Sequence, residues 1–215
     1  RRFASEGCRP RLPWGLALPT LKKDATPIFP ILSKLMQDDS EFVRRSVANN
    51  LNDISKDHPE TILQFAHDWL NKDRSTEKLL KHALRTLLKK GNTRALGYFG
   101  INEGNLSCNG FHVEDKVNIG DRLTFSFEVK NLSDEELMLR IEYRIYFLLA
   151  NGSHNSKVFK ISERNLQSRD KISLTKAHSF RSITTRRFYD GLHHLSIILN
   201  GVEMKKQAFI LSNQT

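Results

Sequence analysis

The chain has 215 residues, which is enough for one or two domains with substantial hydrophobic cores. Its 34 Lys and Arg residues against 24 Asp and Glu residues give a formal net charge of +10, which favours a polyanionic partner. That partner is either nucleic acid or an anionic membrane surface. No apolar run reaches the ~18 residues that a membrane span requires, and the two cysteines, Cys8 and Cys108, exclude a disulfide framework. We therefore expect a cytoplasmic protein.

Residues 1–100 carry the patterns of helices. The chain opens on Arg1, without Met, in a stretch typical of the middle of a helix, so we expect further chain before it. Apolar residues spaced three and four apart, with proline and glycine at the boundaries, predict the later helices. These are expected at about residues 27–37, 40–57, 59–71, 76–90 and 92–98.

The helix predicted over residues 40–57 has two distinct faces. Its apolar residues, Val43, Val47, Leu51 and Ile54, form one narrow stripe. Its opposite face carries Arg45, Asn49, Asn52, Asp53 and Lys56. Asparagine is a poor helix former, so two of them on this face lower the stability of the helix. The face is either a binding or catalytic surface or an ordinary solvated one.

The helices align with one another at shifts of 36 and 43 residues. Val43 aligns with Leu79 at the shorter shift, and residues 1–6 align with residues 44–49 at the longer one. Such periods are typical of a HEAT-like α-solenoid. The alignment makes Arg2, Arg45 and Lys81 equivalent, and likewise Glu6, Asn49 and Arg85. A row of cations across stacked repeats is expected to follow a phosphate backbone, unless it is a basic surface without a ligand.

After Gly100 the periodicity changes from that of helices to that of strands. Apolar residues alternate with polar ones over residues 123–129 and 137–147, and shorter runs follow to residue 211. Asn151-Gly152 and Asn200-Gly201 indicate hairpin turns. The predicted fold class is therefore a mainly α first half of HEAT-like α-solenoid repeats, residues 1–104, followed by an all-β immunoglobulin-like sandwich, residues 105–215.

The segment 180–188 of the second half is rich in arginine. Arg181, Arg186 and Arg187 alternate there with Ser and Thr hydroxyl groups. Such a loop is suited to holding phosphates or entering a minor groove. An ordinary basic strand and turn explains the same residues equally well.

Motifs for phosphate loops, nucleophile elbows and metal sites are missing from the sequence. His193 and His194 are adjacent on a predicted strand, so they point to opposite faces and cannot bind one metal together. We therefore expect no metal and no cofactor. If the protein is an enzyme, carboxylates perform its chemistry, and Glu6 and Asp53 lie on repeat-equivalent helices.

Two long stretches resemble a known family. They are RFASEGCRPRLPW over residues 2–14 and SEFVRRSVANNLNDISKDHP over residues 40–59. Both closely resemble the AlkC branch of the AlkC/AlkD DNA alkylation-repair glycosylases. The resemblance covers nearly the whole chain and includes the change from HEAT-like repeats to an Ig-like domain. Members of this branch carry further N-terminal helices, with another active-site acid, which these 215 residues do not contain.

The resemblance implies a monomeric DNA glycosylase of base excision repair. It implies double-stranded DNA with alkylated bases as the partner, and removal of cationic bases such as 3-methyladenine, 3-methylcytosine and 1-methyladenine without base flipping. Matching positions suggest Asp53 and Glu6 as active-site carboxylates and Trp14 as a contact at the lesion. The residues expected on DNA are Arg2, Arg9, Arg11, Arg45, Asn49, Lys56, Lys81, Arg85, Arg186 and Arg187.

Simpler interpretations of the same residues stay open. Trp14 also fits a residue that packs its loop onto the repeats, and Asp53 fits a helix-terminus residue paired with Lys56 or an arginine. For the whole protein, the alternative is a non-catalytic HEAT-repeat protein that binds nucleic acid or serves as a scaffold. Carboxylates facing DNA weaken plain binding, so Glu6 and Asp53 favour the enzyme.

Overall fold

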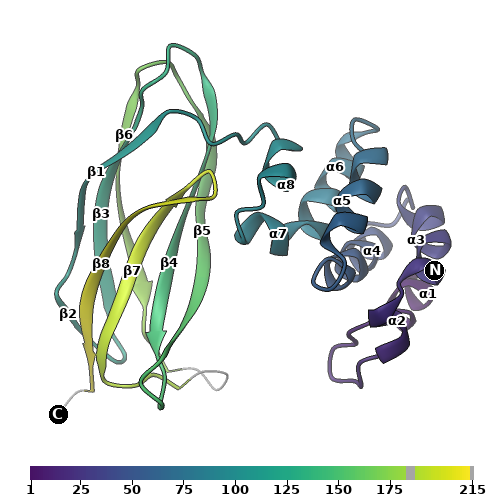
Figure 1. The fold of residues 1–215 in the computed structure, drawn as a ribbon, viewed down its shortest axis with the longest axis horizontal. Coiled ribbons are helices and arrows are strands. Elements are labelled where there is room, and N and C mark those ends of the chain that lie inside the picture. The colour runs from purple at the N-terminus through teal and green to yellow at the C-terminus, as the bar shows by residue number, and fades with distance from the viewer. Residues whose placement is uncertain (183–186, 214–215) are drawn as a thin grey trace. The chain divides into compact units, whose positions relative to one another are not determined.

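The computed structural model describes residues 1–182 and 187–213 and divides the chain into two compact units, Arg1–Phe99 and Gly100–Thr215 (Figure 1). Within the described residues, the helices belong to the first unit and the strands to the second. Among these helices, none combines the length and the apolar character that crossing a membrane requires.

The helical unit is built from short segments. A 3-10 turn, Thr26–Ile28, precedes α3. The helices are α1 (Arg2–Gly7), α2 (Pro19–Lys23), α3 (Phe29–Leu35), α4 (Glu41–Ile54), α5 (Pro59–Asp68), α6 (Arg74–Ala83), α7 (Arg85–Lys89) and α8 (Thr93–Gly97). Proline occupies one of the first two positions of α2, α3 and α5, where its missing N–H group has no helical partner to lose.

The predicted fold class, a regular HEAT-like solenoid in front of the sandwich, is wrong. The described chain has eight short helices and is 31% helix, against 37% strand in two sheets. The helix expected over residues 76–90 is split at Leu84, whose backbone (φ −86°, ψ 4°) separates α6 from α7. At the break, the Thr86 N–H group donates to Asn52 Oδ1 (3.3 Å) and the His82 carbonyl oxygen accepts from the Arg85 guanidinium (2.7 Å), so these partners replace a helical hydrogen bond.

Helices α1, α4 and α6 pack side by side in that order. The apolar stripe of α4 is buried as predicted, from Val43 to Ile54. Its polar face is not simply solvated, because Asn52 and Asp53 are buried as well. The Asn52 Oδ1 atom accepts a hydrogen bond of 2.9 Å from the Thr86 hydroxyl and so ties α4 to α7.

The second unit consists of two sheets. Its strands are β1 (Leu106–Val113), β2 (Lys116–Asn118), β3 (Arg122–Asn131), β4 (Leu137–Leu148), β5 (His154–Leu166), β6 (Lys171–Ser179), β7 (Gly191–Leu199) and β8 (Val202–Ser212). One sheet has the order β1-β3-β6 and the other β2-β8-β7-β4-β5, in which β2 and β8 are parallel. The alternating apolar residues of β3, β4 and β7 form one core between the sheets.

Candidate functional site

The two candidate carboxylates, Glu6 and Asp53, are joined by Arg9. Arg9 donates to the Asp53 Oδ2 atom through Nε (2.8 Å) and Nη2 (2.7 Å). Its Nη1 atom donates to Glu6 Oε1. The Asp53 side chain is only 4% exposed, whereas that of Glu6 is 26% exposed. We call Glu6, Arg9 and Asp53 the helical cluster.

The contact between α1 and α4 holds the helical cluster in place. Asn50 donates to the backbone carbonyl of Ser5 (2.9 Å), and the Ser46 and Ser5 hydroxyl groups lie 3.0 Å apart. Ser46 also donates to Glu6 Oε2 at 2.6 Å. Sequence reasoning missed Ser46 and Asn50 because both are buried between helices rather than on the polar face of α4.

Opposing effects act on the pKa of Glu6. Burial on its own raises that pKa, but hydrogen bonds from Ser46 and Arg9, with the charges of Arg9 and Arg2, bring it below its usual value. Burial lowers the pKa of the nearby Arg85; the charge of Asp53 opposes this effect and the charge of Arg9 adds to it. Glu6 is therefore an ionised carboxylate in a strongly cationic environment.

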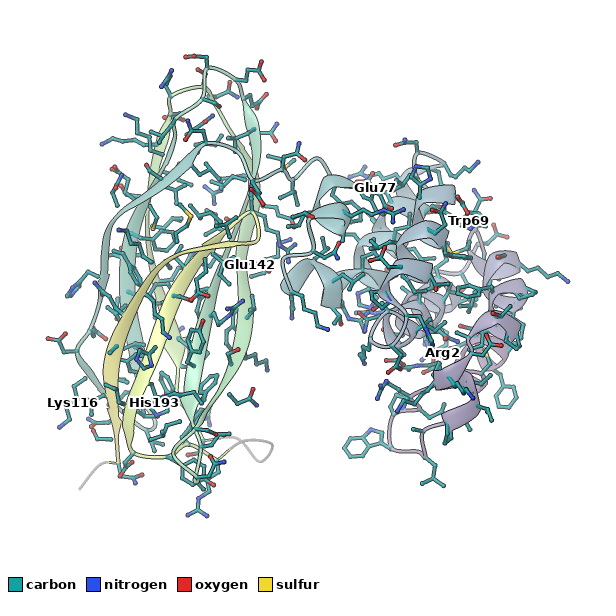
Figure 2. The ribbon with its side chains drawn as sticks, viewed as in Figure 1. Arg2, Trp69, Glu77, Lys116, Glu142 and His193 are labelled. Carbon is teal, nitrogen blue, oxygen red and sulfur yellow. The ribbon has the colours of Figure 1, made fainter. Side chains whose placement is uncertain are left out.

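Several of the cations expected on DNA have partners within the protein, beginning with Arg9, which is buried in the helical cluster. Arg2, which is labelled in Figure 2, donates to the carbonyl oxygen of Phe42 (3.1 Å) and stacks on the Phe42 ring. Arg11 forms two hydrogen bonds to the Asp57 carboxylate, the shorter at 2.7 Å. Lys56 donates to Asp53 Oδ1 at 2.8 Å. To bind a phosphate, each of these groups must either share its hydrogen bonds between the protein partner and the phosphate or release the protein partner.

The remaining expected contacts of this unit lie along α4, α6 and α7. Asn49 Oδ1 accepts a hydrogen bond from Arg85 Nη2 (3.2 Å) and lies 3.0 Å from His82 Nε2. Lys81 Nζ lies 5.3 Å from the centre of the Phe99 ring. Arg45 is exposed. The helix packing thus brings Asn49 and Arg85, which the alignment had made equivalent, into direct contact.

Trp14 is on the outside of the unit. It lies in a loop closed by the bridge between Arg11 and Ala17, and its side chain is fully exposed. Its backbone adopts a φ of 60°, a conformation that few non-glycine residues take. Trp14 therefore does not pack its loop onto the helices, and the ring is free to contact a ligand.

The arginine-rich segment of the second unit is only partly described. Arg186 lies outside the described residues. Arg187 is exposed, and its guanidinium carbon is 5.4 Å from the centre of the Tyr189 ring. In the described part of the chain, His, Cys, Asp and Glu residues form no group of three or more that could hold a metal ion.

Comparisons with known proteins match both units. Residues 13–87 match the family model described as DNA alkylation repair enzyme. Residues 107–213 match the model described as the C-terminal Ig-like domain of the uncharacterised protein YhaZ. The second half of the chain is thus an Ig-like domain.

Two relatives that match nearly the whole of this chain agree with the family models. Uncharacterized protein YhaZ of Bacillus subtilis (strain 168) is 49% identical over 203 residues, which are 94% of this chain and 56% of the relative. A solved structure of Pseudomonas fluorescens alkylpurine DNA glycosylase AlkC bound to DNA containing an abasic site analog is 36% identical. The match has a TM-score of 0.95 and covers 98% of this chain and 59% of that one.

The matches assign the chain to the family whose model is described as DNA alkylation repair enzyme. Within that family, this chain belongs to the AlkC type, because both of its units match over almost their whole length. The chain spans less than two thirds of the length of these relatives.

Proposed function

We propose that the chain carries carboxylates and DNA contacts of a glycosylase that removes cationic N-alkylated bases from double-stranded DNA. The substrates we propose are 3-methyladenine, 3-methylcytosine and 1-methyladenine, excised in base excision repair by a monomer that does not flip the base. The observation that supports this function best is the helical cluster, in which Arg9 holds two carboxylates next to further cations.

The chemistry follows from the charge of the substrate. A base alkylated on a ring nitrogen is already a cationic leaving group, so it departs without a general acid. Positive charge then develops on the deoxyribose, and a fixed carboxylate stabilises that charge and orients the attacking water. We assign these roles to Glu6 and Asp53. Arg9 helps to keep Glu6 ionised and fixes the orientation of both side chains.

The remaining contacts are assigned by position. Trp14, fully exposed on its loop, is proposed to stack on the sugar or the cationic base at the lesion. Arg2, Arg11, Arg45 and Lys56 are proposed to hold phosphates on the same unit. Residues 105–215, as the Ig-like domain, are proposed to add DNA contacts through Arg186 and Arg187.

One observation favours the alternative, a non-catalytic nucleic-acid-binding or scaffold protein. Both oxygens of Asp53 accept hydrogen bonds from cations of the protein, Arg9 and Lys56. A carboxylate with such partners has a complete structural role without any substrate. The excision experiment separates the two functions.

The test is release of 3-methyladenine from methylated duplex DNA by the full chain under single-turnover conditions. Asp53→Asn is expected to slow release by about 10²–10³-fold while DNA affinity is retained. Glu60→Gln, which removes an exposed carboxylate of α5, is the matched control and is expected to react at the wild-type rate.

Two outcomes contradict the proposal in different ways. If Asp53→Asn and Glu6→Gln both release the base as fast as the wild type, the catalytic assignment is wrong. If the wild-type chain binds the DNA and releases no base at all, these 215 residues by themselves do not catalyse excision, and the non-catalytic alternative is favoured for them.

A further inference from the structure

Two buried serines, Ser5 and Ser46, lie at the contact between α1 and α4, next to the helical cluster. Alanine fills nearly the same space between two closely packed helices, so packing alone does not require their hydroxyl groups. A buried hydroxyl group also lowers the stability of the fold unless it forms hydrogen bonds. The hydrogen-bond partners of the two serines therefore indicate their role.

The direction of each hydrogen bond follows from the number of protons available. Ser46 Oγ lies 2.6 Å from Glu6 Oε2 and 3.0 Å from Ser5 Oγ. An ionised carboxylate only accepts hydrogen bonds, so the single hydroxyl proton of Ser46 points to Glu6. Ser46 has no second proton to give, and the Ser5 hydroxyl group therefore donates to Ser46. We call this directed arrangement, from Ser5 through Ser46 to Glu6, the hydroxyl chain.

A serine within a helix has a local alternative, which is to donate to the carbonyl oxygen four residues before it. For Ser46 that oxygen belongs to Phe42, and it accepts a hydrogen bond from Arg2 Nη1 at 3.1 Å. Ser46 instead bonds to Glu6, 40 residues away on α1. The hydroxyl chain thus ends on the carboxylate of the helical cluster that is partly exposed.

Both oxygen atoms of the Glu6 carboxylate have a donor. Arg9 Nη1 donates to Oε1 and Ser46 donates to Oε2, whereas Arg2 Nη2, at 3.9 Å from Oε2, is beyond hydrogen-bond distance. Two donors on opposite oxygens fix the plane of the carboxylate and keep a long, partly exposed side chain in one rotamer. A carboxylate has about four acceptor positions, so Glu6 can still accept hydrogen bonds from a ligand.

The charges around Glu6 act in the same direction as the hydroxyl chain. Burial raises the pKa of Glu6, and the hydrogen bonds from Ser46 and Arg9, with the charges of Arg9 and Arg2, bring it below its usual value. Further charged groups on the neighbouring elements have partners of their own, which are Arg9 and Lys56 for Asp53, and Arg1 for Asp38.

We propose that Ser46 is a positioning residue of the excision reaction and that Ser5 orients its hydroxyl group. The hydroxyl chain holds Glu6 as an anion in one orientation, so that its negative charge is already in place when positive charge develops on the sugar. Both serines are fully buried and act through Glu6 rather than on the DNA. This inference rests on the proposed glycosylase function, since it gives Ser46 a role in that reaction.

The first experiment titrates Glu6 in the full chain without DNA, by NMR of glutamate carboxyl groups labelled with carbon-13. Glu6→Gln identifies the signal. Ser46→Ala is expected to raise the pKa of Glu6 towards the ordinary value of 4.5, because the anion loses a donor. Ser5→Ala keeps that donor but removes its support, so the pKa is expected to rise by a smaller amount.

Ser55→Ala is the matched control for the titration. It removes another buried hydroxyl group, at the C-terminal end of α4, which donates to the carbonyl oxygen of Asn52 at 2.8 Å. The chemical change and the burial are the same as in Ser46→Ala, but Glu6 keeps its donors. The pKa of Glu6 is expected to stay at the wild-type value.

The second experiment measures single-turnover release of 3-methyladenine as a function of pH. Near pH 7 Glu6 is ionised in both proteins, and Ser46→Ala is expected to slow release about tenfold, because the carboxylate loses its fixed orientation. The acid limb of its pH profile is expected to lie at higher pH than that of the wild type. The Kd for a duplex with an abasic-site analogue is expected to stay unchanged, since Ser46 is buried.

The outcomes separate this inference from the proposed function. An unchanged pKa of Glu6 in Ser46→Ala overturns the inference, and so does equal slowing by Ser46→Ala and Ser55→Ala, which indicates a loss of stability alone. Base release by the wild-type chain together with either result leaves the glycosylase proposal intact. If the wild-type chain releases no base, a raised pKa in Ser46→Ala still supports the hydroxyl chain, while the glycosylase proposal and the role of Ser46 in the reaction fail for these residues.

Discussion

The two units of the molecule each contain an arginine between two carboxylates. In the helical cluster Arg9 joins Glu6 and Asp53. In the Ig-like unit Arg140 joins Glu142 and Glu163, which we call the sheet cluster. The two clusters have the same kinds of charged group, and both arginines are buried.

The clusters differ in how they are formed. Arg140 and Glu142 lie two residues apart on one face of β4, and Glu163 is the cross-strand partner of Arg140 on β5, so the sheet register alone brings them together. Glu142 is labelled in Figure 2 and is 1% exposed. The helical cluster instead joins residues 44 positions apart, and Glu6 remains partly exposed.

This difference shows that an arginine with two carboxylates does not by itself define an active site. The sheet cluster is less exposed to solvent, with Glu142 1% and Glu163 12% exposed, and is formed by neighbours in regular structure. The helical cluster has an accessible carboxylate and lies among cations that can hold phosphates. Access and surrounding charge, rather than composition, make the helical cluster the candidate site.

The largest effect is expected from removing the two arginines. Arg9→Met and Arg140→Met each leave two carboxylates without their guanidinium partner, which is expected to lower the free energy of unfolding by about 3–5 kcal/mol. Arg140→Met is expected to have the greater effect, since both of its carboxylates are more deeply buried than Glu6. Urea denaturation measures the difference, and a greater loss in Arg9→Met contradicts the comparison.

The next effect concerns the carboxylates themselves. Glu6→Gln is expected to slow base release by about 10²-fold, because it removes negative charge next to the developing positive charge of the sugar. Glu142→Gln makes the same chemical change in the sheet cluster and is expected to leave release at the wild-type rate. Equal slowing by both variants in single-turnover assays argues that Glu6 acts only through stability.

The pH dependence of the free energy of unfolding is expected to differ between the two units by a smaller amount. Burial lowers the pKa of His193 in the Ig-like unit and of His82 in the helical unit. Each contributes stability that is present above the unfolded-state pKa of 6.5 and is lost as the pH falls through the folded-state pKa.

The loss is expected to be greater for the Ig-like unit, because His193 is completely buried and His82 is not (Figure 2 labels His193). One proton changes the free energy of unfolding by at most ~1.4 kcal/mol per pH unit. Denaturation between pH 7 and pH 5 measures the slope, and His193→Gln is expected to reduce it. An unchanged slope in that variant shows that other groups cause the loss.

The smallest effect on stability is expected from Trp14→Ala, within about 0.5 kcal/mol, because the side chain makes no buried contacts. The affinity of the Trp14→Ala variant for a duplex with an abasic-site analogue is nevertheless expected to fall by about 2- to 30-fold. Val202→Ala, an exposed position of the Ig-like unit, is the control and is expected to change neither quantity. Unchanged affinity of Trp14→Ala removes it from the interface.

Much of the local structure was predictable from periodicity. The buried stripe of α4 and the main strands of the second unit follow from apolar spacing, which depends on neighbouring residues alone. The predicted HEAT-like solenoid was not correct, since contacts such as that of the Thr86 N–H group with Asn52 accompany a break at Leu84 in a helix that the local sequence favours. The roles of Glu6, Asp53 and the DNA-contacting residues remain predictions.

By itself, the sequence determined the change from helical to strand periodicity near Gly100, the net positive charge of the chain and the residues available for chemistry. Only the tertiary structure decided that Arg9 reaches Asp53, that Asp53 is buried and that Ser46 donates to Glu6. The physical reason is the distance along the chain over which the contacts that determine each property extend. Periodicity reflects contacts within one or two turns, whereas the burial of a charge and its partners depend on how distant segments pack.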